Sequence, residues 1–322
     1  MRSRDYNFFV VTILFVSFIF AYLAQTGFYG FNIDFYKEYH KSNLFYQYPW
    51  FDRLGAAIAT LTISNIHLGV GVTSFILATS SGFLILSFFK LKKQNSYFIF
   101  LIIFLITLHV HPIIMSTSGA MRQGLAMAFL FFAISLLIHD RKLWSFISMF
   151  FVLFMHKSGI VLFALFVATF ICLSFVKKMK NYQFILFIII VLIFFLISSY
   201  GITFTKFDEK THRVVYGDFR YLWLLINLLF IFFYLFVFIK IDNFKLKYVS
   251  TYLFLHAFVA ISFLFMGLNY QYERINMIIS MLLILVVGSM FKKKQGYIYI
   301  LSSLGFYLFL TIYQGMYSIG LI

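Results

Sequence analysis

The chain has 322 residues, of which 63% are hydrophobic and only 11% are charged, and its formal net charge is +16. A soluble domain of this length needs more charged surface than that composition supplies, so we expect an integral membrane protein. The excess of Lys and Arg does not indicate nucleic-acid binding, because these residues are dispersed between long apolar runs. Cys172, the single cysteine, lies inside an apolar run and indicates neither a disulfide nor a cysteine metal site.

Apolar runs follow one another along the whole chain, and a run of roughly 20 residues is long enough to cross a bilayer as a helix. No convincing cleavage site follows the first run, which indicates an uncleaved first span. The longest hydrophilic connections are 25–53 and 201–219, too short for a soluble domain. We therefore expect one all-α integral membrane domain over 1–322, a polytopic helix bundle of about eleven spans. The predicted spans are 8–24, 69–89, 96–113, 121–138, 143–156, 159–176, 182–200, 220–239, 248–267, 274–291 and 297–317.

The distribution of basic residues predicts the orientation. With the N-terminus in the cytoplasm, the inner connections carry 16 of the 26 Lys and Arg residues, including the clusters KLKK, KKMK and KKK. Such an excess on alternate connections follows the positive-inside rule. The predicted outer connections carry 7 of the 10 acidic residues, so the outer face has mixed charge. An odd number of spans then places the C-terminus outside.

Cations stand at the start of most helices that we expect to run from the outside inwards. They are Arg122, Lys157, Arg220 and Arg274, and Arg53 has a similar place before the second span. A helix start carries the positive end of the macrodipole, so a cation there is mildly unfavourable. Together these residues suggest positive potential directed at an anion. The alternative is that interfacial Arg and Lys side chains reach lipid headgroups.

The stretch from Ser116 to Gly124 is the strongest candidate for anion binding. It combines hydroxyl residues and glycines with Arg122 and Gln123 where a helix is expected to begin. Free backbone N–H groups and a forked guanidinium both suit phosphate oxygens.

Further polar groups interrupt apolar runs on the predicted outer side. His156, Lys157 and Ser158 separate two spans, and a histidine there suits a general base, although a polar turn would look the same. Glu273 and Arg274 form either a local ion pair or an acid beside a second phosphate ligand. Asp34 lies in a Tyr-rich amphipathic stretch that either binds sugar or anchors the chain at the interface.

Several of these residues resemble the EpsG-like and O-antigen polymerase (Wzy) membrane proteins. The resemblance is carried by GAMRQGLAMAFLFFAISLL at 119–137 and by FMHKSGIVLF at 154–163. GFNIDFY at 30–36 is similar to the early Gly-Asp-Tyr region of that family, with altered spacing, and Arg274 is similar to its C-terminal arginine. The specific part covers Arg122, Gln123, His156 and Ser158.

The resemblance implies a multi-pass protein of the bacterial cytoplasmic membrane that joins oligosaccharide repeat units carried on undecaprenyl diphosphate. It implies action at the outer leaflet, with a chain-length regulator and a flippase as protein partners and with no nucleic acid. On this hypothesis Arg122 and Arg274 bind diphosphate, supported by Gln123, Lys157, Ser158 and Arg220. His156, Glu273 or Asp34 takes the acceptor proton, and neither a metal nor another cofactor is required.

Three alternatives stay open. An O-antigen ligase is another membrane glycosyltransferase, but such ligases often carry a large outer domain between late spans. A lipid-linked oligosaccharide flippase or other transporter would place charges within spans and show related halves. A membrane acyltransferase would place its histidine near a cytoplasmic acyl donor. No Walker loop, Rossmann glycine pattern or zinc spacing occurs in the sequence.

Overall fold

The protein is described from a computed structural model that covers residues 3–27, 54, 66–94, 96–117, 120–156, 158–176, 219–237, 241, 243–265 and 269–318. These residues are helical apart from short turns, and they contain no strand. The all-α prediction is therefore confirmed for this part of the chain. The predicted span at 182–200 and nearly all of the two long connections lie outside it.

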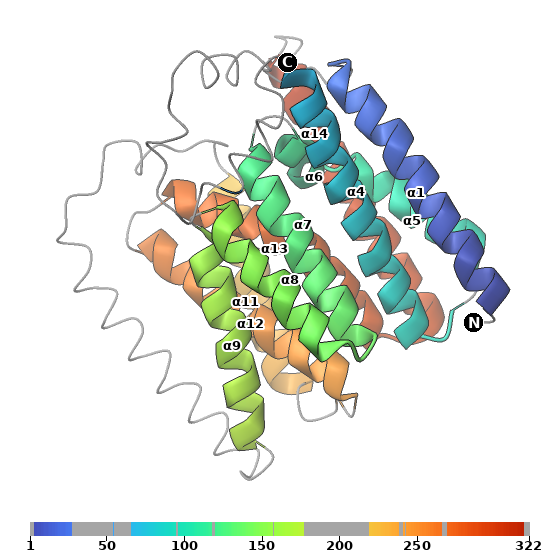
Figure 1. Ribbon diagram of the computed structural model, residues 1–322. Coiled ribbons are helices and arrows are strands. Elements are labelled where there is room, and N and C mark those ends of the chain that lie inside the picture. The colour runs from blue at the N-terminus through green and yellow to red at the C-terminus, as the bar shows by residue number, and fades with distance from the viewer. Residues whose placement is uncertain are drawn as a thin grey trace. The chain divides into compact units, whose positions relative to one another are not determined.

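Eleven helices are described, labelled as in Figure 1. They are α1 (Ser3–Gln25), α4 (Ile66–Leu91), α5 (Tyr97–Leu108), α6 (His111–Thr117), α7 (Met121–Ile138), α8 (Lys142–Met155), α9 (Ser158–Val176), α11 (Phe219–Val237), α12 (Phe244–Phe265), α13 (Asn269–Met290) and α14 (Lys293–Ser318). Six of the helices in the described residues are long and apolar enough to cross a membrane, or seven spans if the bent pair α5–α6 counts as one. The count of eleven spans stays a prediction.

The third predicted span differs from a single helix. The run at 96–113 forms α5 and then α6, and the two helix axes are bent by 59°. Pro112 lies in the first turn of α6, where the missing N–H costs no helical hydrogen bond. The residue before a proline is also disfavoured inside a helix, so the chain turns before His111 rather than continuing α5.

Backbone contacts divide the chain into two compact units. The first comprises 1–163 and 281–322, and the second comprises 164–280. The boundaries fall inside α9 and α13, and we describe each unit by itself.

In the first unit, α1, α4, α7 and α8 pack side by side (Figure 1). Small residues permit this close approach, as is common between membrane helices. A Cβ added to Gly71 of α4 would lie 2.7 Å from the Gln25 side chain, and one added to Gly82 would lie 2.7 Å from Ile13. α1 and α4 are therefore antiparallel. Ser87 of α4 and Ser135 of α7 share a hydrogen bond of 2.6 Å between their hydroxyl oxygens.

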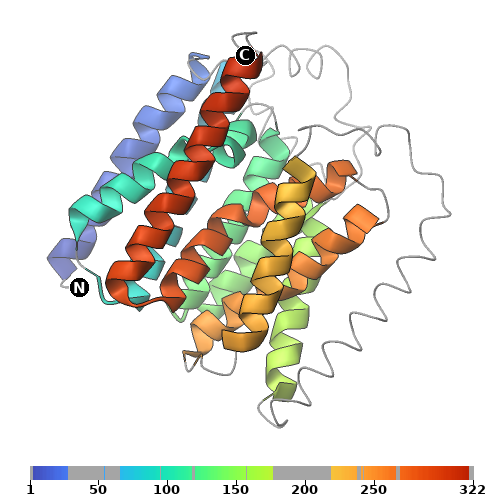
Figure 2. The ribbon, with the colours of Figure 1, turned by 180° about the vertical axis from the view of Figure 1, so that it is seen from behind.

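The reverse view shows α14 running along α5 (Figure 2). In their most apolar windows, only 33% of α1 and 22% of α14 are buried, compared with 78% of α4 and of α7. The exposed side of α1 carries large apolar side chains such as Phe15 and Phe18, which suit contact with lipid. α4 and α7 therefore form the interior of this unit, and α1 and α14 lie at its surface.

Four helix termini with basic residues meet at one end of the first unit. The Lys90 Nζ atom lies 3.0 Å from Nδ1 of His139, which follows α7, and the His139 ring contacts Tyr6 near the start of α1. Lys92 Nζ donates to the Phe291 carbonyl oxygen, between α13 and α14, at 2.9 Å. We call this the basic end. The clusters KLKK and KKK, which the orientation prediction assigns to one compartment, share this end, whereas KKMK lies outside the described residues. Which compartment that end faces stays a prediction.

In the second unit, α9, α11, α12 and α13 are linked by buried polar contacts. Tyr248 Oη donates to the Phe166 carbonyl oxygen at 2.7 Å, and Tyr234 Oη lies 2.8 Å from Thr251 Oγ1. The Tyr234 and Phe254 rings stack with centroids 4.4 Å apart. These contacts tie α12 to α9 and to α11.

Candidate functional site

The start of α7 is held against the end of α6 by a glycine. A Cβ at Gly124 would clash with the carbonyl oxygen of Ser116, so only glycine permits this backbone approach. The Ala120 N–H donates to the Met115 carbonyl oxygen at 2.8 Å across the short connection. The sequence motif around Arg122 therefore begins a helix, as expected, and its glycine has a defined packing role.

The break between α5 and α6 is stabilised from another helix. The His111 N–H, at the start of α6, donates to Thr311 Oγ1 of α14 at 2.7 Å. Thr311 in turn donates to the Tyr307 carbonyl oxygen at 2.8 Å. A broken span exposes backbone groups at membrane depth, and such breaks are tolerated where protein covers them or where they line a binding cavity.

Arg122 and His156 lie at the same end of the antiparallel pair α7–α8. Ser145 Oγ of α8 donates to the Ala133 carbonyl oxygen at 2.6 Å, and Ser148 Oγ donates to the Phe129 carbonyl oxygen at 2.8 Å. Continuing this register to the end of α8 places His156 level with the first turn of α7, which contains Arg122. Because α7 ends at the basic end, both residues lie at the opposite end of the unit. The structure thus places two of the predicted site residues at one end of the same helix pair.

The side chains at this end differ in accessibility. Arg122 is partly exposed, whereas Gln123 is 1% exposed and His156 is 4% exposed. Arg122 is therefore the most accessible of the three side chains, whereas Gln123 and His156 lie in the helix interface.

His156 is fixed by the start of α9. Its Nδ1 atom lies 2.7 Å from Ser158 Oγ and 3.2 Å from the backbone nitrogen of Ser158. A backbone N–H can only donate, so Nδ1 accepts, and in the neutral ring the proton is on Nε2. His156 thus satisfies one of the N–H groups that a helix start leaves without an intrahelical partner. This geometry favours hydrogen-bond donation by Nε2 over the general-base role expected from the sequence.

The tight turn at His156 also needs a glycine. A Cβ at Gly159 would clash with the Val152 carbonyl oxygen, and the Gly159 N–H donates to the His156 carbonyl oxygen at 2.7 Å. Ser158 and Gly159 therefore position the histidine, so this turn has a structural role.

The remaining predicted site residues are distributed as follows. Glu273 and Arg274 lie in the first turns of α13, in the second unit, where Glu273 is fully buried and Arg274 is partly exposed. Arg220 lies at the start of α11, in the same unit. Asp34 and Lys157 lie outside the described residues. A cavity shared by Arg122, His156 and Arg274 stays a prediction, because Arg274 belongs to the other unit.

The second unit contains buried polar side chains that the sequence did not single out. Asn227 Nδ2 of α11 donates to Asn276 Oδ1 of α13 at 2.8 Å, and Asn276 is one turn from Glu273. His256 is fully buried, and neither ring nitrogen has a hydrogen-bond partner among the described residues. Asn276 follows Glu273 by one helical turn on α13, a signal that was available in the sequence.

Within the described residues, no group of three or more His, Cys, Asp and Glu side chains is arranged to hold a metal ion. No protein-family model matches the chain, and neither a curated protein nor a solved structure is similar enough to match it. The resemblance to membrane polysaccharide polymerases therefore stays a hypothesis that rests on the sequence stretches around Arg122 and His156.

Proposed function

We propose that the protein is a glycosyltransferase-type polymerase that joins undecaprenyl-diphosphate-linked oligosaccharide units at the outer leaflet of a bacterial cytoplasmic membrane. The observation that carries the proposal is the level placement of Arg122 and His156 at one end of α7–α8, beside the broken span α5–α6. A cation and a hydrogen-bond donor at one helix end suit a diphosphate. The stretches 119–137 and 154–163, which resemble the polymerases, contain these two residues.

In the proposed reaction, a hydroxyl oxygen of the incoming unit attacks the anomeric carbon of the growing chain. The bond from that carbon to the lipid diphosphate breaks, and the electron pair leaves on the diphosphate oxygen. Arg122 and the Nε2–H of His156 stabilise the charge that develops there, as preorganised donors do. The hydroxyl proton passes to a base, and the sequence offers the carboxylates of Glu273 and Asp34 as candidates for that role.

A transporter of lipid-linked oligosaccharide is the second candidate, and two observations favour it. The pair α5–α6 is a broken span, which is common at the binding sites of secondary transporters. Glu273 is a fully buried carboxylic acid on α13, and ionisable residues inside membrane spans often lie on substrate or ion paths. Both features are compatible with a polymerase as well.

The test is deletion of the gene in its native host, complementation with variants, and electrophoresis of the surface glycan. We expect loss of the polymer ladder with a single repeat unit retained. Complementation with Arg122→Ala should lower polymer synthesis by roughly 10²–10³-fold, the cost of removing one donor to a developing oxyanion. Arg141→Ala, an exposed arginine at the basic end, is the matched control and should restore the full ladder.

Other outcomes contradict the polymerase. Loss of every unit from the surface indicates the transporter, and accumulation of unattached polymer indicates a ligase. The Arg122→Ala variant could be present in the membrane at the same level as the control and still give a full ladder. That result would show that Arg122 is not part of the site.

A further inference from the structure

Thr311 lies on α14, at the surface of the first unit, and its side chain reaches the break between α5 and α6. Its Oγ1 atom accepts the N–H of His111 at 2.7 Å and donates to the Tyr307 carbonyl oxygen at 2.8 Å. A hydroxyl group can accept and donate through the same oxygen atom. Thr311 therefore uses its hydroxyl twice, once within α14 and once across to the start of α6.

The break leaves one backbone donor for another helix to satisfy. The two N–H groups before His111 donate to carbonyl oxygens of α5, and the two N–H groups after Pro112 both donate to the Val110 carbonyl oxygen. Pro112 itself has no N–H. The His111 N–H donates to Thr311 instead. A backbone N–H without an acceptor is costly at membrane depth, so the Thr311 hydroxyl stabilises the bent arrangement of α5 and α6.

The short helix α6 connects this break to the candidate site. It has seven residues, which corresponds to a length of about 10 Å. Five of the seven residues are buried, so α6 is packed against its neighbours along its whole length. Because a packed helix moves as one body, a change in the position of its first turn is passed on to its last turn.

The last turn of α6 sets the position of the first turn of α7. The Ser116 carbonyl oxygen packs against Gly124 at a distance that leaves no room for a Cβ, and the Met115 carbonyl oxygen accepts the Ala120 N–H at 2.8 Å. Arg122 lies between these two contacts along the chain. The position of the Arg122 backbone therefore depends on the position of α6.

We propose that Thr311 is a positioning residue for the site at Arg122. Its hydroxyl holds the break at His111, the break holds α6, and α6 holds the first turn of α7. Thr311 does not itself contact the substrate. The proposal rests on the proposed function, because the reaction that it supports is the polymerisation assigned to Arg122.

The test compares two threonines that have the same pattern of hydrogen bonds. Thr251, in the second unit, donates to the Lys247 carbonyl oxygen at 2.8 Å, and its Oγ1 atom lies 2.8 Å from the Tyr234 hydroxyl of another helix. Thr311→Val and Thr251→Val therefore each remove one hydrogen bond within a helix and one between helices. The two variants should lose similar amounts of stability, and only Thr311→Val should affect α6.

Hydrogen–deuterium exchange of the full-length protein in mild detergent, measured by mass spectrometry, reports on the break directly. Peptides from 109–117 should exchange about tenfold faster in Thr311→Val than in wild-type protein, the factor for one lost hydrogen bond of ordinary strength. The same peptides should exchange at the wild-type rate in Thr251→Val. They should also do so in Thr311→Ser, which keeps the hydroxyl group.

Glycan electrophoresis of the complemented deletion strain measures the effect on the reaction. Thr311→Val should lower polymer synthesis by up to about 10²-fold, because a misplacement of about 1 Å at a reacting group has an effect of that size. Thr311→Ser and Thr251→Val should restore the ladder. If Thr311→Val is absent from the membrane, Thr311→Cys decides by the same two measurements, because a thiol accepts only weak hydrogen bonds.

Three outcomes would overturn the positioning role. Wild-type exchange of 109–117 in Thr311→Val would show that the hydroxyl does not hold the break. Faster exchange with a full ladder would show that the break does not position the site. Equal losses of polymer from Thr311→Val and Thr251→Val would assign Thr311 a general role in stability. An intact ladder after gene deletion would refute the polymerase itself, whereas the exchange rates would still decide whether Thr311 holds α6.

Discussion

His156 shows how one side chain can serve both a turn and a site. Its Nδ1 atom accepts the Ser158 N–H at the start of α9, which leaves Nε2 with the proton of the neutral ring. The structural role and the proposed chemical role therefore use different nitrogens. Two amide substitutions separate them, because the oxygen of asparagine can occupy the place of Nδ1 and the terminal amide of glutamine can occupy the place of Nε2.

His156→Asn should keep the folded protein close to wild-type stability but abolish the polymer ladder, since it retains the acceptor for Ser158 and loses the donor. His156→Gln should lower the free energy of unfolding by about 1 kcal/mol, the usual cost of a lost helix cap, while retaining part of the activity. Thermal unfolding in detergent and glycan electrophoresis measure the two effects. An active His156→Asn together with an inactive His156→Gln would show that the Nε2–H is not the group that matters.

At the scale of helices, glycines set the distance between neighbours. Gly124 permits the end of α6 to touch the first turn of α7, and this contact positions Arg122. Gly305, on α14, has no heavy atom within 4 Å of the place where a Cβ would be. The two glycines thus provide a matched pair for the same substitution.

Gly124→Ala should destabilise the protein by about 1–3 kcal/mol, because the added methyl group forces α6 away from α7. Gly305→Ala should leave stability unchanged or raise it by about 0.5–1 kcal/mol, because alanine loses less backbone entropy in a helix. Thermal unfolding of the two variants in one detergent gives the comparison. If both variants unfold at the same temperature as the wild-type protein, the close approach of Ser116 to Gly124 does not stabilise the site.

The helices were largely predictable, because a membrane span needs a long apolar run whatever its neighbours are. The predicted span 121–138 has the bounds of α7, and the other predicted spans in the described residues differ from their helices by a few residues at each end. The broken span was missed, although Pro112 marked it, because apolar content is the same on both sides of a bend. The close approach at Gly124 depends on Ser116, a residue that no helical periodicity connects with it.

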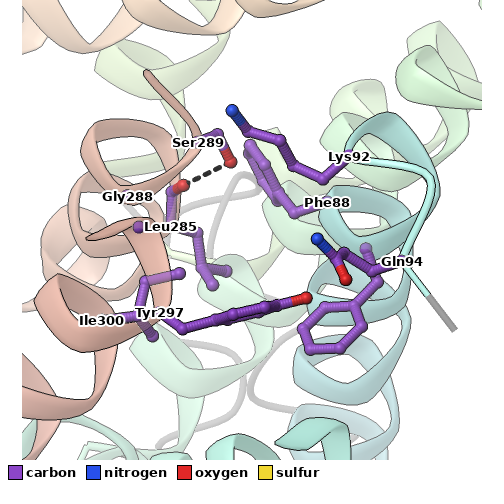
Figure 3. A pocket seen from close by; sticks show the side chains of 10 residues that line it. Phe88, Lys92, Gln94, Leu285, Gly288, Ser289, Tyr297 and Ile300 are labelled. Atoms are coloured by element: carbon purple, nitrogen blue, oxygen red, sulfur yellow. Dashed lines mark hydrogen bonds between the residues drawn. The ribbon is translucent and has the colours of Figure 1, made fainter. Parts of the chain in front are cut away.

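The candidate site was predictable only in part, because a sequence motif does not show which atom of a side chain faces the ligand. The sequence singled out both Arg122 and His156. Their position at the same end of the helix pair follows from the register of α7 and α8. The tautomer of His156 and the burial of Gln123 depend on packing and could not be predicted. A small hollow beside Lys92 was not visible in the sequence, because Gln94 and Tyr297 in its walls come from distant segments (Figure 3).

At the scale of the whole molecule, the two ends of the first unit have different chemistry. The basic end gathers the lysines at the turns after α4 and α13, and the other end carries Arg122 and His156. The positive-inside rule assigns the basic end to the cytoplasm. The proposed polymerase requires that assignment, because its lipid-linked units are joined at the outer leaflet.

Single-cysteine variants test the assignment in a Cys172→Ala background, which removes the one native thiol. Thr26→Cys follows α1 at the end opposite the basic end, and Lys292→Cys lies in the turn between α13 and α14; both native side chains are exposed. In right-side-out membrane vesicles, a membrane-impermeant maleimide should label Thr26→Cys at once and Lys292→Cys only after permeabilisation. The reverse pattern would place Arg122 and His156 in the cytoplasm. A polymerase at the outer leaflet could not then use them.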